Sequence, residues 1–230
     1  LRKRKSFKSR TWKACDSDRM SVAIFFDLDG TLITYPEDFR TLFEESIGSE
    51  VSDEVFDLYV DKLFQSIENL EDSPYQKAFI EAEKAADIDF NAEKAAENYI
   101  KIELNATELN QDLYNLMKKF SKKHNVGILT NGEGNVQRKK IRRHGISEVA
   151  DDIIISNEVG SRKPGQEIFQ IAKDRITADN YIYIGDTYEE DIEPAKKTGF
   201  KTVYISGENE ADLQARNPNS LAKLLNTLLD

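Results

Sequence analysis

The chain has 230 residues, a formal net charge of −10 and a single cysteine, Cys15. The acidic excess opposes broad binding to nucleic acids or anionic membranes, a lone cysteine excludes an intramolecular disulfide, and no apolar run approaches the ~20 residues that span a bilayer. We therefore expect a cytoplasmic protein that binds neither nucleic acid nor membrane. No heptad repeat or other interface pattern predicts its oligomeric state.

Residues 1–20 form a basic leader. They contain eight Lys and Arg but only two acids, a local charge of +6 within the total of −10, so the remainder carries −16. Three interpretations are open: a tail that binds nucleic acid, an organellar targeting segment, or residues translated upstream of the usual start, at Met20. We favour the third, and expect the leader to be disordered or foreign to the folded domain.

A buried strand is predicted at residues 22–26, where five apolar residues precede Asp27, Asp29 and Gly30. Glycine lets the chain turn sharply there. Two carboxylates two residues apart repel each other unless a cation lies between them, which predicts a hard metal such as Mg²⁺ with oxygen ligands. The alternative is a polar turn in which the aspartates serve only the backbone.

Residues 34–104 contain no convincing strand and are predicted to be a helical insertion. Apolar residues recur there mostly at intervals of three and four, as amphipathic helices require, and Ser52 and Asn91 begin segments with helix-start signals. Arg40 is a candidate contact for a second anionic group, the alternative being an ordinary exposed helix arginine. Most aromatic side chains should lie inside the bundle, with one or two free to stack on a sugar or base. These aromatic residues are Phe39, Phe43, Tyr59, Phe64, Tyr75, Phe79 and Tyr99.

From residue 105 onward, helical and strand patterns alternate. Together with residues 21–33, residues 105–230 therefore predict an α/β core with a doubly wound parallel sheet. The helices are expected at about 108–123, 134–144, 165–174, 189–198 and 218–229, and the strands at 125–130, 152–156, 181–185 and 201–205.

Three later motifs place polar side chains at strand ends or before a helix. Because ligands bind at the carboxyl ends of strands in an open parallel sheet, we expect these motifs to meet Asp27 and Asp29 in one crevice. The motifs are Thr130-Asn131-Gly132 after one strand, Lys163 before a proline suited to the start of a helix, and Asp186 after a further strand, with Asp191 close behind.

Each of these motifs has a simpler alternative. Thr130 could only cap the helix that follows, and Lys163 could be a solvated loop lysine. Glu189 and Glu190 fit exposed acids in the first turn of a helix, so we place them outside the site.

In this order, the motifs resemble those of the haloacid dehalogenase (HAD) superfamily of phosphotransferases, in the subfamily with an α-helical cap. The resemblance covers about residues 21–206. It implies a Rossmann-like core in which residues 34–104 are the cap, whose closure excludes water and whose lining selects the substrate. The motifs that carry it are Asp27-Leu28-Asp29-Gly30-Thr31, Thr130-Asn131-Gly132, Lys163-Pro164, and Gly185-Asp186 with Asp191.

The resemblance also implies catalytic roles. Asp27 would be the nucleophile that forms an aspartyl-phosphate, and Asp29 would give a proton to the leaving oxygen and later take one from water. Lys163 would place positive charge beside the transferring group.

The remaining roles concern metal and substrate. Mg²⁺ would be held by Asp27, Asp186 and the backbone carbonyl of Asp29, while Asp191 orders a metal-bound water. The phosphoryl oxygens of the substrate would be bound by Thr130, Asn131 and Gly132.

These roles predict a Mg²⁺-dependent phosphatase that acts on a small phosphorylated metabolite, a sugar phosphate or a nucleotide. The acid at Asp29 argues against the dehalogenase branch, because a halide needs no proton to leave. Two alternatives stay open: a phosphomutase of the same superfamily, and a regulatory module that binds phosphate or metal without turnover.

Overall fold

A computed structural model describes residues 20–205, 213–215 and 221 of the chain. The predicted leader lies outside the described residues except for Met20, and the helix expected at 218–229 lies outside them except for Leu221. Among the helices of the described part, none is both long and apolar enough to cross a membrane.

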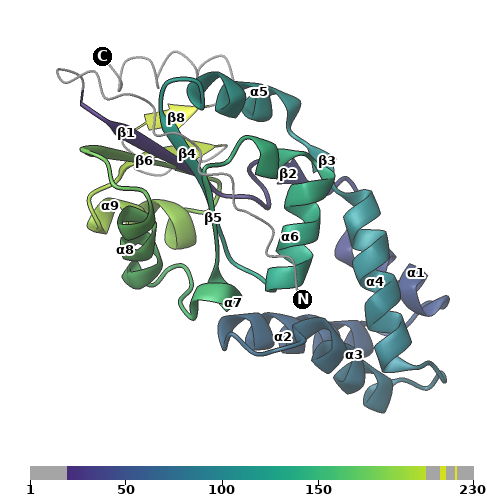
Figure 1. Ribbon diagram of the computed structural model, residues 1–230. Helices are drawn as coiled ribbons and strands as arrows, with labels where there is room; N and C mark the ends of the chain where they lie inside the picture. Colours follow the sequence, from purple (N-terminus) through teal and green to yellow (C-terminus); the bar gives the residue numbers. More distant parts are fainter. Residues whose placement is uncertain (1–19, 206–212, 216–220, 222–230) are drawn as a thin grey trace, which may run out of the picture.

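The described strands of the core form one parallel sheet. They are β1 (Val22–Phe26), β4 (Asn125–Thr130), β5 (Asp152–Ile155), β6 (Asn180–Gly185), β7 (Lys201–Ile205) and β8 (Leu213–Ala215). Their order is β5-β4-β1-β6-β7-β8, so the first strand is central and later strands extend the sheet on both sides (Figure 1). The predicted doubly wound parallel sheet is confirmed.

Helices cover both faces of this sheet. Successive strand residues point to opposite faces, and in β1 this places Ile24 and Phe26 in one apolar cluster and Ala23 and Phe25 in another. A strand covered on both faces has no solvent side, which explains the uninterrupted apolar sequence of β1. The first cluster includes side chains of α5 (Gln111–Phe120) and α6 (Gly134–Arg143), and the second includes those of α8 (Gln166–Arg175) and α9 (Glu193–Lys197).

The core differs from the sequence expectation at two helix starts and by one additional helix. The helix expected at 108–123 begins after Asn110, whose side chain accepts the amide of Leu113 and caps α5. The helix expected at 189–198 starts with a π-helical turn at Tyr188–Ile192. A short unpredicted helix, α7 (Ser156–Val159), follows β5 directly. Helices and strands this short have too few residues to show a period.

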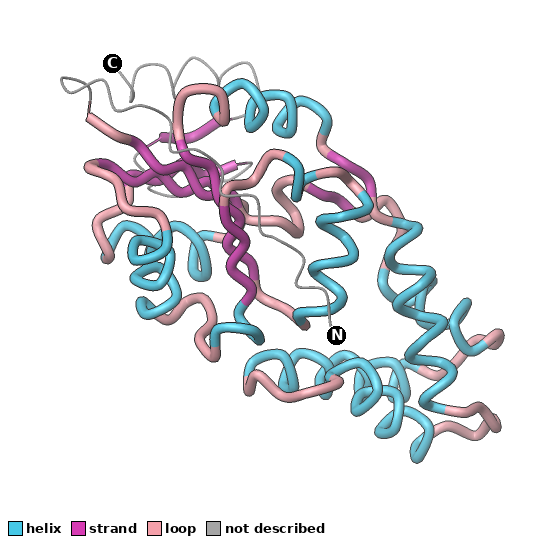
Figure 2. The backbone as a smooth tube through the Cα atoms, in the orientation of Figure 1, coloured by secondary structure: helices cyan, strands magenta, loops and turns pink. Residues whose placement is uncertain are grey.

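Four helices that follow β1 and precede α5 form the helical insertion. Its helices lie to one side of the sheet (Figure 2), and Ser52 and Asn91 cap two of them through their side chains, as the sequence predicts. An unpredicted two-stranded ribbon, β2 (Ile33–Thr34) against β3 (Glu108–Leu109), joins the two connections to the core. The helices are α1 (Phe39–Ile47), α2 (Asp53–Glu68), α3 (Pro74–Ala85) and α4 (Ala92–Ala106).

The insertion has its own aromatic core. Phe43 stacks on Phe79 with ring centroids 5.1 Å apart, and Tyr59, Tyr75 and Tyr99 are buried in the same cluster. The two remaining aromatic residues of the expected set, Phe39 and Phe64, are 48% and 54% exposed. These two side chains are therefore free to meet a ligand.

Candidate active site

Three carboxylates converge at the carboxyl ends of β1 and β6. Asp27 follows β1, Asp186 follows β6, and Asp191 lies in the helical turn beyond it. One oxygen atom from each of these residues lies within 4.8 Å of the others. The sheet order accounts for this meeting, since β1 and β6 are hydrogen-bonded neighbours at the point where the strand order reverses.

Lys163 lies inside this carboxylate cluster. Its Nζ atom is 2.8 Å from Asp27 Oδ1 and 2.5 Å from Asp191 Oδ1, and its side chain is buried. Burial raises the pKa of the Asp27 carboxyl well above its usual range; Lys163 opposes this rise, while Asp191 and Asp186 add to it. Burial would lower the pKa of Lys163, but the carboxylates of Asp191 and Asp27 raise it. One lysine thus only partly neutralises three acids.

The remaining oxygen atoms fit a divalent cation. Asp191 is fully engaged: Lys163 and the Tyr183 hydroxyl donate to Oδ1, and the amides of Asp186 and Thr187 donate to Oδ2. On Asp27, by contrast, Lys163 contacts Oδ1. Oxygen atoms of Asp27 and Asp186 could therefore ligate Mg²⁺, with Asp191 holding the surrounding groups in place.

Gly30 gives Asp186 the space it occupies. A Cβ atom on Gly30 would lie 2.2 Å from Asp186 Oδ2, and Gly30 has a φ of +79°, which L side chains rarely adopt. Asp186 also accepts a hydrogen bond from the Thr31 hydroxyl at 2.9 Å. The turn after β1 therefore positions the carboxylate that follows β6.

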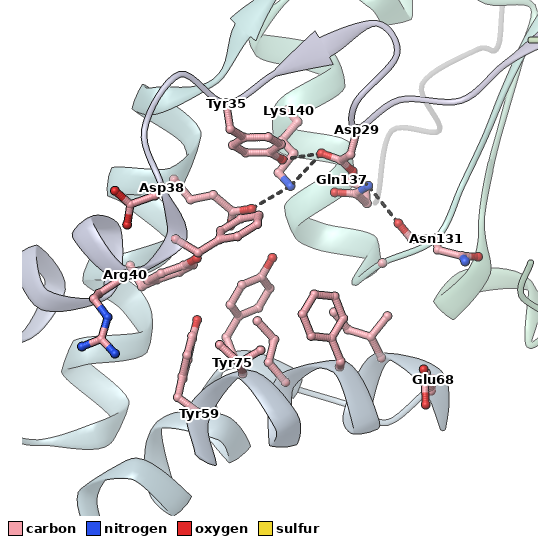
Figure 3. Close-up of a pocket in the computed structure, with 18 of the residues that line it drawn as sticks. Asp29, Tyr35, Asp38, Arg40, Tyr59, Glu68, Tyr75, Asn131, Gln137 and Lys140 are labelled. Atoms are coloured by element: carbon pink, nitrogen blue, oxygen red, sulfur yellow. Dashed lines mark hydrogen bonds and ion pairs between the residues drawn. The ribbon is translucent and has the colours of Figure 1, made fainter. Parts of the chain in front are cut away.

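The side chain of Asp29 lies beside Tyr35, Gln137 and Lys140, at the boundary with the helical insertion (Figure 3). It accepts hydrogen bonds from the Tyr35 hydroxyl, from Gln137 Nε2 at 2.5 Å and from Lys140 Nζ at 3.2 Å. Burial would raise the pKa of Asp29, but Lys140 and these hydrogen bonds outweigh burial and lower it. Asp27 thus lies among carboxylates that raise its pKa, whereas Asp29 lies among hydrogen-bond donors that lower its pKa.

Lys140 connects Asp29 to the insertion. Its Nζ atom lies 2.8 Å from Glu103 Oε1 on α4 as well as 3.2 Å from Asp29 Oδ1, and its side chain is 4% exposed. Burial would lower the pKa of Lys140, but Asp29 and Glu103 raise it well above its usual value. Sequence analysis missed this bridge. One signal was available: Gln137, Lys140 and Ile141 share the buried face of α6 at helical spacing.

The Thr130-Asn131-Gly132 segment lies between the two environments. The Thr130 hydroxyl accepts from Gln137 Nε2 at 2.9 Å, and the Gly132 amide donates to the Ser156 hydroxyl at 3.0 Å. Asn131 exchanges two hydrogen bonds with the backbone of Lys163, at 2.9 and 3.0 Å. In this structure Asn131 therefore positions Lys163.

Glu190, which sequence analysis left outside the site, contacts it directly. Its carboxylate accepts from Asn131 Nδ2 at 3.1 Å and pairs with Arg162 at 2.8 Å. An acid in the first turn of a helix is ordinarily exposed. Glu190 contacts the site because the fold places Arg162 and Asn131 next to it.

A pocket of about 530 Å³ opens beside Asp29, between the core and the insertion (Figure 3). Asn131, Gln137 and Lys140 line its core side together with Asp29. The insertion contributes aromatic and aliphatic side chains, among them Tyr59 and Phe64 of α2. A group bonded to a phosphoryl held near Asp27 would extend past Asp29 into this pocket.

Sequence comparisons match the chain to one family of hydrolases and to relatives named as phosphatases. A family model described as haloacid dehalogenase-like hydrolase matches residues 24–205. The chain is 39% identical over 82 residues to glyceraldehyde 3-phosphate phosphatase of Methanocaldococcus jannaschii, an alignment covering 35% of this chain and 36% of that protein. It is 26% identical over 208 residues to N-acylneuraminate-9-phosphatase of Rattus norvegicus, covering 80% and 82%. With pyrimidine 5′-nucleotidase YjjG of Escherichia coli it shares 28% over 106 residues, covering 45% and 47%.

Solved structures share the fold. The HAD-hydrolase YfnB of Bacillus subtilis, bound to magnesium, superposes with a TM-score of 0.71 at 22% identity and covers 90% of this chain and 99% of its own. A 2-haloacid dehalogenase of Pseudomonas syringae superposes with a TM-score of 0.68 at 17% identity, covering 91% and 100%. These likenesses extend over the core and the helical insertion together.

Proposed function

The chain belongs to the family of haloacid dehalogenase-like hydrolases, and on that premise we propose that it is a Mg²⁺-dependent phosphomonoesterase that acts through an aspartyl-phosphate at Asp27. One observation carries the proposal: of two aspartates two residues apart, Asp27 belongs to a cluster of three carboxylates that could hold a cation, and Asp29 lines the pocket between the core and the insertion. In this proposal residues 34–104 act as the cap. The relatives named above as phosphatases support the reaction class.

The first half-reaction uses both aspartates. An oxygen of Asp27 attacks the phosphorus atom, the bond from phosphorus to the ester oxygen breaks, and that oxygen leaves with the electron pair and takes a proton from Asp29. In the second half-reaction Asp29 takes a proton from water, which attacks the phosphorus and releases inorganic phosphate and free Asp27.

Positive charge around Asp27 lets two anions meet. Lys163 keeps its charge because its pKa is raised, and its Nζ atom lies 2.8 Å from Asp27 Oδ1. Mg²⁺, which Asp27, Asp186 and the Asp29 carbonyl would hold, supplies further charge between the carboxylates and the phosphoryl group when bound. The Thr130 hydroxyl and the Gly132 amide would donate to phosphoryl oxygens in exchange for their present acceptors, the Asn131 carbonyl and the Ser156 hydroxyl.

Asp29 must gain a proton before it can donate one. Its pKa is lowered mainly by Lys140, so it is ionised in the ligand-free site. A phosphate ester that enters beside it adds negative charge, which raises the pKa of Asp29 toward the value a general acid needs. Substrate binding thus prepares the proton donor.

Phosphate release from a panel of sugar phosphates and nucleotides, with and without Mg²⁺, tests the proposal. Activity should require the metal and should fall by at least about 10³-fold in Asp27→Asn, whereas Asp61→Asn, an exposed change on α2, should leave it unchanged. Activity that survives in Asp27→Asn would overturn the nucleophile. Isomerised phosphorylated product without phosphate release would instead identify a phosphomutase.

A further inference from the structure

Among the described residues, the pocket beside Asp29 has no basic side chain without an acidic partner. Its lining includes five acidic side chains, of Asp29, Asp38, Glu68, Glu103 and Glu190, but only three basic ones, of Arg40, Lys140 and Arg162. The lining therefore carries a net charge of −2. A leaving group with its own phosphate or carboxylate would be repelled.

Each of the three cations already has an acidic partner. Arg40 pairs with Asp53 at 2.7 Å and Glu44 at 3.4 Å, and the Lys140 and Arg162 pairs are described above. The sequence left open whether Arg40 contacts a second anionic group. In the structure its guanidinium lies over the Phe56 ring, 4.6 Å from the centroid, and is held by these carboxylates.

The wall of the pocket suits a flat, apolar surface. One face of α2 presents Val60, Leu63, Phe64 and Ile67 at intervals of three and four. Tyr35, which precedes α1, lies on the opposite side of the pocket beside Lys140 and Asp29 (Figure 3). Aromatic and aliphatic walls facing each other bind rings through stacking and the removal of apolar surface from water.

Three buried polar atoms of residues in this lining have no hydrogen-bond partner among the described residues. They are the Tyr59 hydroxyl, Glu103 Oε2, which is an acceptor, and Arg162 Nε, which is a donor. Glu103 is almost fully buried, and a buried carboxylate oxygen without a partner is costly. A ligand that offers an N–H or O–H group to Glu103 would satisfy it.

We propose that the substrate's leaving alcohol is uncharged and carries a flat ring with a hydrogen-bond donor, the chemistry of a nucleoside. The inference rests on the proposed phosphatase function and concerns its substrate class. A volume of about 530 Å³ falls within the range of roughly 300–1,000 Å³ that accepts molecules of this size. A three-carbon leaving group would leave most of the pocket unfilled.

Three probes distinguish the substrate classes: uridine 5′-monophosphate, glycerol 3-phosphate and fructose 1,6-bisphosphate. We expect kcat/KM for the nucleotide to exceed that of both others by at least about 10-fold, as differential binding in a matched pocket allows. Equal or higher kcat/KM for either other ester would overturn the substrate class and leave the phosphatase proposal standing. Phosphate release from none of the three would overturn both.

A charge placed in the pocket should reverse the preference. In Leu63→Lys we expect kcat/KM to fall about 5-fold or more for the nucleotide and to rise for the bisphosphate, because the new cation faces the leaving group. Gln65→Lys adds the same charge to an exposed position of α2 outside this pocket and should change both values less than about 2-fold. Equal responses of the two variants would refute the inference.

A second variant, Phe64→Ala, tests the inference if Leu63→Lys does not fold. Phe64 is half-exposed, so Phe64→Ala should fold normally, which a thermal melt can verify. It should raise KM for the nucleotide about 5-fold with kcat unchanged, since a stacking contact formed equally in ground and transition states is lost. KM for glycerol 3-phosphate should stay within about 2-fold. An unchanged KM for the nucleotide would also refute the inference.

Discussion

Asp27→Asn should abolish activity and, at the same time, stabilise the metal-free protein. The Asp27 carboxylate is 6% exposed and lies within one cluster with Asp186 and Asp191. Burial and the two neighbouring acids oppose its ionised form more strongly than Lys163 favours it, so its pKa is raised. Asparagine has the same shape and no charge, and it removes this opposition.

Replacing buried charged groups by neutral ones of similar volume is often stabilising by about 1–4 kcal/mol, and we expect the gain in the free energy of unfolding to fall in that range. Each kcal/mol corresponds to roughly 2–4 °C in Tm for a protein of this size.

The gain should depend on pH with a defined sign. The folded wild type holds a proton on Asp27 at pH values where the unfolded chain has lost it, so its stability falls as pH rises from about 4 to the raised pKa. The variant does not suffer this loss. Its advantage should therefore be absent at pH 4, grow as pH rises, and become constant above the raised pKa of Asp27.

Thermal melts in EDTA across this pH range measure the effect, with Asp61→Asn as the exposed control. Mg²⁺ at 100 times its dissociation constant should then stabilise the wild type by about 2.7 kcal/mol and Asp27→Asn by much less. Asp27→Asn melting below the wild type at pH 8 in EDTA, with an unchanged control, would refute the reasoning, because it would show that Lys163 outweighs burial and the neighbouring acids.

Three further changes test other parts of the structure. Lys140→Met leaves the buried Glu103 and the partly exposed Asp29 without their cation and should cost about 3 kcal/mol in urea unfolding, the lower end of the range for a buried pair; a loss below about 1 kcal/mol would contradict the bridge. Gly30→Ala should abolish the rise in Tm caused by Mg²⁺, because its Cβ would displace Asp186, whereas Gly48→Ala, with a similar φ of +76° but nothing within 4 Å, should retain that rise. Phe79→Ala should cost about 3–5 kcal/mol in the same urea assay; a cost no larger than that of the partly exposed Ile80→Ala would argue against the aromatic core of the insertion.

Much of the site could be predicted because its residues sit at strand ends. A parallel sheet brings the carboxyl ends of its strands to one edge. The meeting of Asp27, Thr130 and Asp186 could therefore be predicted without knowledge of side-chain packing. The contact of Lys140 with Glu103 could not be predicted in this way, since it joins a core helix to the insertion through a tertiary packing that no local period encodes. The cytoplasmic location and the lack of nucleic-acid and membrane binding stay predictions from composition.

The central position of β1 has a consequence for how the chain folds during synthesis. β1 pairs with β4 and β6, which place Ala23 beside Asn125 and Tyr181. At about 5–20 residues per second, the ribosome needs roughly 8–30 s to add the 158 residues that follow Ala23 up to and including Tyr181. During that time the most apolar strand of the core has emerged without both neighbours, while the insertion can form its local helical contacts. Nascent chains should therefore be vulnerable to aggregation, and slower translation would lengthen the exposure of β1.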